Sequence, residues 1–192
     1  AAAIMVNARP YVIELEAGNK TIPTSVFFDF SNQKMMIGSA ANAALIQGRE
    51  GRFMRSLKSV LGAPLMRERR KIIGQDMTFV DIIGAFLAEI KSKAEAACHT
   101  KFDFALSGRP VHFHSTDPAR DEQALIDLTE CYEKAGFAQV EFVFEPEAAA
   151  LSAGNLDAGP ALGLIVDIGG GTSDFSVFRA CETDGKLLPG VE

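Results

Sequence analysis

Short apolar runs separated by turn-forming residues open the chain. Apolar residues at positions 3–6 and 11–15 flank a segment that contains Pro10, which has no backbone N–H to donate within a sheet. This pattern predicts a β-hairpin with Pro10 in its turn or at a strand edge. The apolar runs at residues 26–30 and 35–37 predict a second hairpin. The opening of the chain is therefore expected to be mostly strand.

Beyond Ser39 the apolar residues recur at the spacing of a helix. We expect a short helix over residues 40–46 that ends at Gly48. Apolar residues within positions 53–61 share one helical face, which predicts a second helix. Lys58 would lie on that second helix.

Longer helices and strands alternate in the rest of the sequence. Thr78 precedes apolar residues at helical spacing and is suited to cap a long helix that reaches about residue 98. Strands are predicted at residues 102–106, 140–144, 162–168 and 173–179, and helices at residues 121–135 and from Pro146 onward. This order indicates a layered α/β fold in which helices flank a mixed sheet.

The composition is that of a folded, acidic protein. Hydrophobic residues make up 47% and charged residues 23% of the 192 positions, close to the average for globular proteins. The length allows one well-buried domain or two small lobes. A formal net charge of −6 gives no basic excess for nucleic acid or an anionic membrane, so neither partner is expected.

Three cysteines are present, Cys98, Cys131 and Cys181, and they are far apart. An odd number at this spacing favours reduced thiols over a disulfide framework and predicts a cytoplasmic protein. The longest apolar stretches, such as residues 161–168, are too short to cross a bilayer. The first residues include no targeting pattern. They resemble the middle of a β-strand, so we expect the sequence to begin inside a structural element.

A glycine-rich turn follows the strand expected at residues 162–168. Its sequence runs from Asp167 through Ile168, Gly169, Gly170, Gly171, Thr172 and Ser173 to Asp174. Consecutive glycines carry no Cβ, so their backbone N–H groups can surround a phosphate closely. Asp167 suits a hydrated Mg²⁺, and the Thr172 hydroxyl suits a terminal phosphate or an attacking water. A plain glycine hairpin with solvated carboxylates is the alternative.

About twenty residues upstream, Glu145 and Pro146 stand between a predicted strand and an alanine-rich helix. Together with the glycine turn, this segment resembles the connecting helix and second phosphate loop of the seventy-kilodalton heat-shock chaperones, within the actin-like ATPase superfamily. The resemblance is good over residues 140–178, weaker over 102–136 and fainter over the first hundred residues.

The resemblance implies a fold and a division into lobes. Residues 1–157 would form lobe I of an actin-like ATPase, with a ribonuclease H-like α/β fold and an inserted α+β subdomain at about residues 17–95. Residues 161–192 would be the first hairpin of lobe II. The first phosphate loop of the family is missing and the second lobe is incomplete, so we expect the isolated chain to hydrolyse ATP poorly.

Site roles are also implied by the resemblance, with ATP and Mg²⁺ as cofactors. Asp167 would be a carboxylate on the Mg²⁺ side, and Thr172 would face the γ-phosphate. Lys58 would neutralise charge that develops on the transferred phosphate, and Glu145 would position or activate the lytic water. The amides that grip the phosphate would be those of Gly169, Gly170 and Gly171.

Structural alternatives exist for these and other residues. Lys58 alone has the pattern of a solvent-facing lysine, and Glu145 would also stabilise the positive end of the helix that follows it. The His112 and His114 pair would lie on one strand face as metal ligands or as ordinary strand histidines. The charged run at residues 67–71 is interpreted as a solvated loop.

Two positions depart from the chaperone pattern. Phe144 stands where the chaperones carry a polar asparagine, and Gly108-Arg109-Pro110 replaces a more apolar strand end, so that Pro110 matches the family's relay proline only weakly. These changes indicate a divergent branch.

Three functional hypotheses remain open. The first is ATP binding and hydrolysis coupled to peptide clients and co-chaperones through regions absent here. The second is an actin-like scaffold that senses nucleotide without hydrolysing it, and the third is a small-molecule kinase on the same fold. Fold resemblance alone does not choose among them.

Overall fold

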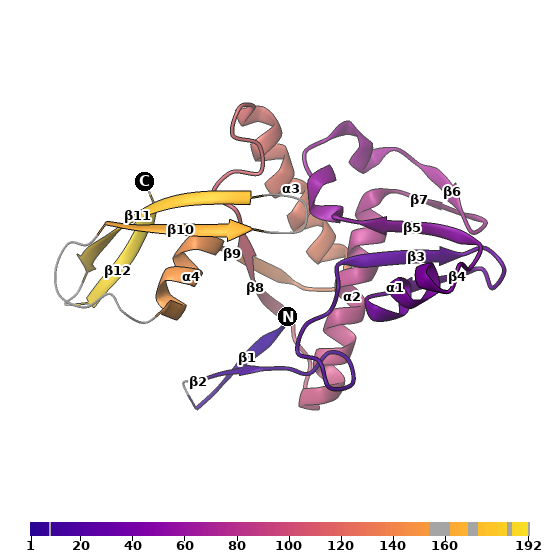
Figure 1. Ribbon diagram of the computed structural model, residues 1–192, viewed down its shortest axis with the longest axis horizontal. Helices are drawn as coiled ribbons and strands as arrows, with labels where there is room; N and C mark the ends of the chain where they lie inside the picture. The colour runs from indigo at the N-terminus through magenta and orange to yellow at the C-terminus, as the bar shows by residue number, and fades with distance from the viewer. Residues whose placement is uncertain (8, 154–161, 169–172, 184–185, 192) are drawn as a thin grey trace. The chain divides into compact units, whose positions relative to one another are not determined.

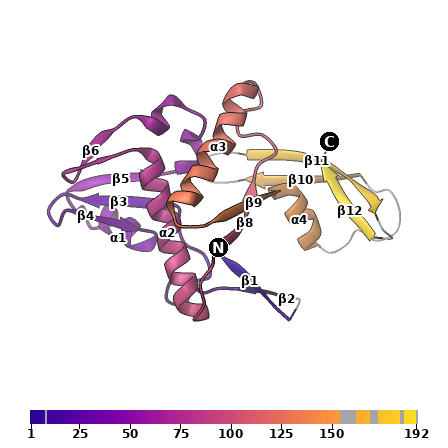
Figure 2. The ribbon, with the colours of Figure 1, turned by 180° about the vertical axis from the view of Figure 1, so that it is seen from behind.

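The computed structural model describes residues 1–7, 9–153, 162–168, 173–183 and 186–191 (Figures 1 and 2). The chain forms two compact units. Residues 1–105 and 118–140 make up the first unit, and residues 106–117 and 141–192 make up the second. The described strands group into five small sheets, and the helices and strands together give an α/β structure.

The first unit opens with a hairpin of β1 (Ala3–Val6) and β2 (Arg9–Val12). Pro10 lies in β2 opposite Met5, so it occupies a strand of a two-stranded sheet and not the turn. Such a position is open to proline because an edge strand leaves some N–H groups unpaired. The predicted first hairpin is confirmed, with its second strand two residues earlier than expected.

A three-stranded antiparallel sheet forms the core of the first unit. Its order is β4 (Lys34–Ile37), β3 (Ser25–Asp29) and β5 (Gly51–Arg55), and every residue of the central strand is buried. Helix α1 (Ser39–Ile46) packs against β3, where the fully buried Ala41 and Ala44 meet Phe27. Small alanine side chains allow this close approach of helix and sheet.

The predicted helix over residues 53–61 is wrong. Residues 51–55 form strand β5, in which Phe53 pairs with Phe27, and Leu57–Val60 form the 3₁₀ helix η1. Ser56 separates the two with a left-handed φ of 56°. Burial of an apolar strand against β3 outweighs the weak helical spacing of these residues. Lys58 therefore lies on a single 3₁₀ turn.

Helix α2 (Phe79–Cys98) confirms the predicted long helix and its cap. The Thr78 hydroxyl accepts a hydrogen bond from the Asp81 N–H, and the Asp81 carboxylate accepts one from the Thr78 N–H, which is a capping box. Helix α3 (Pro118–Lys134) packs along α2 and begins three residues before the predicted start. Figures 1 and 2 show α1 and α2 on opposite sides of the β4–β3–β5 sheet.

The charged run at residues 67–71 is only partly a loop. After the 3₁₀ helix η2 (Pro64–Arg67), Arg70 and Lys71 belong to β6 (Arg70–Ile72), which pairs with β7 (Gln75–Met77). The Lys71 side chain is exposed, and Ile72, which follows it, is buried. The loop prediction is therefore corrected for these two residues.

Strands β8 (Phe104–Arg109) and β9 (Gln139–Phe144) pair with each other, and each has residues in both units. In the second unit, β9 leads into α4 (Glu145–Ala153), which packs against an antiparallel sheet. That sheet consists of β10 (Leu162–Ile168), β11 (Ser173–Thr183) and β12 (Lys186–Val191). The hairpin of β10 and β11 was predicted, whereas β12 was not.

Cys98 and Cys131 are free thiols, as predicted. Within the described part of the chain, no helix has the length and apolar character needed to span a bilayer.

Candidate functional site

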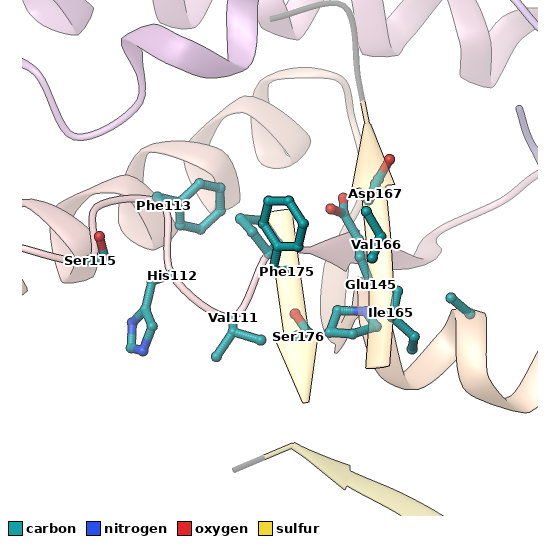
Figure 3. A pocket seen from close by; sticks show the side chains of 13 residues that line it. Val111, His112, Phe113, Ser115, Glu145, Ile165, Val166, Asp167, Phe175 and Ser176 are labelled. Carbon is teal, nitrogen blue, oxygen red and sulfur yellow. The ribbon is translucent and has the colours of Figure 1, made fainter. Parts of the chain in front are cut away.

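A cavity of about 520 Å³ lies within the second unit (Figure 3). Three segments that are far apart in the sequence line it: the loop after β8, the start of α4, and the adjacent ends of β10 and β11. Two predicted site residues, Glu145 and Asp167, are among the lining residues. The fold thus brings two of the predicted carboxylates to one cavity.

Glu145 is the first residue of α4, directly after β9 ends at Phe144. The next residue, Pro146, is buried, and Ala150 one turn later is 3% exposed, so the apolar side of α4 fixes the helix start. Proline suits this first turn because its missing N–H would have no helical partner there. Glu145 itself stays partly exposed at the cavity.

Asp167 is the penultimate residue of β10 and pairs in register with Asp174 of β11. Its side chain is exposed. Figure 3 shows the carboxylates of Glu145 and Asp167 pointing the same way beside Phe175. A cation bound at this edge of the cavity would find oxygen ligands there.

Gly108 lies directly against Glu145. A Cβ built on Gly108 would stand 3.2 Å from Glu145 Cγ and 3.6 Å from Oε1, closer than ordinary van der Waals contact for the first atom. The absence of a side chain at residue 108 therefore leaves the space that the Glu145 side chain occupies. This contact could not be predicted, because Gly108 lies beyond the strand expected at residues 102–106.

Arg109 contacts two aromatic rings, and one of them, Phe113, lines the cavity. Its guanidinium lies over the ring of Phe144 at 4.9 Å and over that of Phe113 at 5.7 Å. Nε donates to the Pro110 carbonyl and an Nη donates to the Val111 carbonyl, at 3.1 and 2.9 Å. Sequence reasoning noted the unusual residues at positions 109 and 144 but missed their contact, because they stand 35 positions apart.

Lys58 lies on η1, which belongs to the first unit. That 3₁₀ helix ends at Val60, and Gly62, two residues later, donates its N–H to the buried carboxylate of Asp127 at 2.8 Å. Gly62 has a φ of +76°, and a Cβ there would stand 2.3 Å from the Arg120 carbonyl oxygen. Helix α3 therefore holds the segment that follows the Lys58 turn tightly.

Gly169, Gly170, Gly171 and Thr172 lie outside the described residues. The strands on either side are described, with Ile168 paired to Ser173. These strands bring the two ends of the glycine segment together, as a hairpin requires.

The predicted histidine pair does not lie on a strand. His112 and His114 belong to the loop that follows β8, so the alternation that would place both on one strand face is absent. In Figure 3 the His112 ring points away from Glu145 and Asp167. No group of three or more histidine, cysteine, aspartate or glutamate side chains suited to a metal occurs among the described residues.

Comparisons with known proteins agree with this arrangement of elements. The family model described as Hsp70 protein matches residues 63–187, which is more than half of the chain. The chain belongs to the Hsp70 family. Among curated proteins, the chaperone protein DnaK of Ureaplasma urealyticum serovar 10 is 30% identical over 188 residues. DnaK of Ureaplasma parvum serovar 3 is 29% identical over the same length.

These alignments cover 97% of this Hsp70 family chain and 29% of each relative. The chain therefore spans less than a third of the length of the curated DnaK proteins that it matches. The matched region of the Hsp70 model includes Glu145, Asp167 and the glycine segment, and it begins after Lys58.

The Hsp70 membership makes Mg²⁺ with a nucleotide the relevant ligand to test against the described residues. Mg²⁺ keeps several waters and is usually held by one or two carboxylates together with phosphate oxygens. An exposed Asp167 at the cavity edge, with no cluster of three ligands among the described residues, fits that kind of site. It does not fit a closed structural metal site, which needs four protein ligands.

Proposed function

We propose that this chain is the first part of an actin-like ATPase domain that binds and hydrolyses ATP. The observation that carries the proposal is the placement of Glu145 and Asp167 on one cavity, in a chain that belongs to the Hsp70 family. Phosphoryl transfer to water needs mainly positioning and charge neutralisation, and two carboxylates on one cavity are compatible with that requirement.

The two carboxylates have different tasks in this proposal. Asp167 would hold a hydrated Mg²⁺ beside the nucleotide, and that ion would supply neutralisation of phosphate charge when bound. Glu145 accepts a hydrogen bond from the water that attacks the terminal phosphate, which orients the water and increases its negative character. The buried Pro146 and the glycine at position 108 fix the side chain that performs this task.

The other residues act on the phosphate itself. The backbone N–H groups of Gly169, Gly170 and Gly171 bind phosphate oxygens, and the Thr172 hydroxyl contacts the terminal phosphate. Lys58 neutralises the charge that develops during transfer. These assignments rest on the resemblance of the motifs and on membership of the Hsp70 family.

The ATPase proposal extends to domain organisation and partners. Residues 1–157 are proposed as lobe I, with an inserted subdomain at about 17–95, and residues 161–192 as the beginning of lobe II, in which β10 and β11 form the predicted hairpin and β12 adds a third strand. Exposed apolar side chains on one side of that hairpin support a further covering element; they are Leu162, Leu164, Val166, Phe175 and Val177. The relatives named as chaperones support peptide clients and co-chaperones as partners, reached through lobe movement.

The test is single-turnover hydrolysis of Mg-ATP by the full-length protein that carries this chain. Wild type is compared with Lys58→Ala, Glu145→Gln and Thr172→Ala, and nucleotide affinity is measured for each. We expect every variant to bind Mg-ATP and to lose at least about a hundredfold in rate, the usual contribution of a general base or a charge-stabilising group.

Other outcomes would select the other two hypotheses. Tight ATP binding by wild type without hydrolysis would replace the ATPase by a nucleotide-sensing scaffold. Phosphate transfer to an added small molecule faster than to water would indicate a kinase. The intact sequence from Asp167 to Thr172 counts against a scaffold that has lost nucleotide binding. The Glu145-Pro146 helix fits the chaperone branch better than the kinases.

A further inference from the structure

The two departures of this chain from the chaperone pattern touch each other. Arg109 replaces a more apolar strand end, Phe144 replaces a polar asparagine, and the Arg109 guanidinium stacks on the Phe144 ring at 4.9 Å. Phe113 contacts the same guanidinium at 5.7 Å. A contact between two unusual positions indicates that they serve one structural purpose.

That contact lies next to the carboxylate assigned to the attacking water. Phe144 is the last residue of β9, and Glu145 follows it directly as the first residue of α4. Gly108, which precedes Arg109, lies against the Glu145 side chain. Arg109 is therefore linked to Glu145 in two ways, through the preceding Gly108 and through the ring of Phe144.

Hydrogen bonds extend the reach of the arginine into the cavity loop. The guanidinium donates to the carbonyls of Pro110 and Val111, two residues that line the cavity together with Glu145. Charge-assisted hydrogen bonds are stronger than neutral ones, and a guanidinium over an aromatic face adds a further electrostatic attraction. One side chain thus restrains the loop, the end of β9 and the start of α4.

We infer that Arg109 is a positioning residue that, through Phe144 and the Pro110-Val111 backbone, holds Glu145 at the depth in the cavity where it meets the attacking water. The inference rests on the proposed ATPase function. Arg109 does not touch the reacting atoms in this assignment. Arg109 sets the position of Glu145, which contacts the attacking water.

The chemistry of arginine makes the inference specific. A planar guanidinium can stack on a ring while donating in its own plane to two carbonyls. Lysine retains the charge but has a compact ammonium that cannot do both at once. A role in general electrostatics would tolerate Arg109→Lys, whereas the positioning role would not.

The experiment compares the full-length wild type with Arg109→Lys, Arg109→Met and Phe144→Leu. Single-turnover Mg-ATP hydrolysis, Mg-ATP affinity and the thermal midpoint are measured for each. We expect a rate loss between about tenfold and a hundredfold, the usual effect of a small misplacement of a catalytic group, with affinity within about threefold of wild type. Phe144→Tyr, which keeps the ring, should retain the wild-type rate.

A double substitution supplies a second readout. If the arginine and the ring act as one unit, Arg109→Met combined with Phe144→Leu should be no slower than the slower single variant. Arg70→Met is the matched control, because Arg70 forms an exposed ion pair with Glu68 in the other unit, and its rate should be unchanged.

The outcomes separate the inference from the function on which it rests. A wild type that does not hydrolyse ATP would refute both. Hydrolysis by wild type, with Glu145→Gln inactive but Arg109→Lys within twofold of the wild-type rate, would overturn the positioning role alone. Equal losses of rate, affinity and thermal midpoint in every Arg109 variant would also overturn it, because they would show a general loss of structure.

Discussion

The buried carboxylate of Asp127 accepts a hydrogen bond from the backbone N–H of Gly62, with 2.8 Å between the two atoms. Asp127 is 1% exposed, and its other oxygen accepts from Gln123 and forms an ion pair with Arg67 at 2.9 Å. These contacts join the middle of α3 to the segment just after the turn that carries Lys58. Asp127 thus anchors the segment that follows the proposed catalytic lysine.

Removing this carboxylate should destabilise the protein. Asp127→Ala leaves the buried Gly62 N–H without its partner, and such a group costs about 1 to 3 kcal/mol. The midpoint of urea unfolding should fall accordingly. Glu130→Ala is the control, because Glu130 is the exposed partner of the same Arg67 and should cost less than about 1 kcal/mol. Equal shifts for the two variants would contradict the anchoring role of Asp127.

A methyl group at position 108 should impair hydrolysis more than folding. The Cβ of Gly108→Ala would press on Glu145 Cγ at 3.2 Å, and the partly exposed glutamate side chain can yield by a few tenths of an ångström. We expect a single-turnover rate roughly tenfold lower, because catalytic geometry is sensitive to small displacements. The unfolding midpoint should change little. A wild-type rate would show that Gly108 does not set the position of Glu145.

The Cys131 thiol should resist alkylation in the folded protein. Burial first, and then the nearby charges of Asp127 and Glu130, raise its pKa to about 12. At pH 8 only about one thiol in ten thousand would be the reactive thiolate. Iodoacetamide treatment followed by peptide mass analysis should find Cys98, which is partly exposed, modified well before Cys131. In denaturant both should react, and rapid native modification of Cys131 would contradict its burial.

The sequence was most informative where local and long-range preferences agree. Thr78, Asp81 and the apolar spacing after them all favour a helix, and α2 forms with the predicted cap. At residues 53–61 the preferences disagree. The apolar spacing is compatible with a helix, but pairing of Phe53 with Phe27 in the buried sheet determines a strand. Local pattern cannot reveal such a partner.

In the candidate site, too, some features follow from local motifs and others only from long-range packing. Glu145 and Asp167 were predicted from motifs, and the structure places both on one cavity. Arg109 could not be assigned, because its meaning depends on Phe144, a contact that only the pairing of β8 with β9 creates. Motifs identify residues that carry chemistry, whereas the side chains that hold them are specified by tertiary packing.

Acid should weaken the N-terminal end of α2 within a defined pH range. The ammonium of Lys134, 2.8 Å from the Asp81 carboxylate, and the Thr78 N–H lower the pKa of Asp81 from 3.8 to about 2. A carboxylate whose pKa is lower in the folded state stabilises the fold above its unfolded pKa, and this contribution is lost as the carboxylate takes up a proton. The loss should therefore occur between about pH 4 and pH 2.

Asp81→Asn tests this link between titration and stability. The variant keeps an oxygen for the Thr78 N–H but has no charge for Lys134 or for the positive helix end, so it should lose about 1 kcal/mol at neutral pH. Urea unfolding from pH 5 to pH 2 should show a shallower decline for the variant than for wild type, with the two curves converging near pH 2. Glu122→Gln, at an exposed position on α3, should leave the decline unchanged. Parallel curves for Asp81→Asn and wild type would mean that another carboxylate controls the acid response.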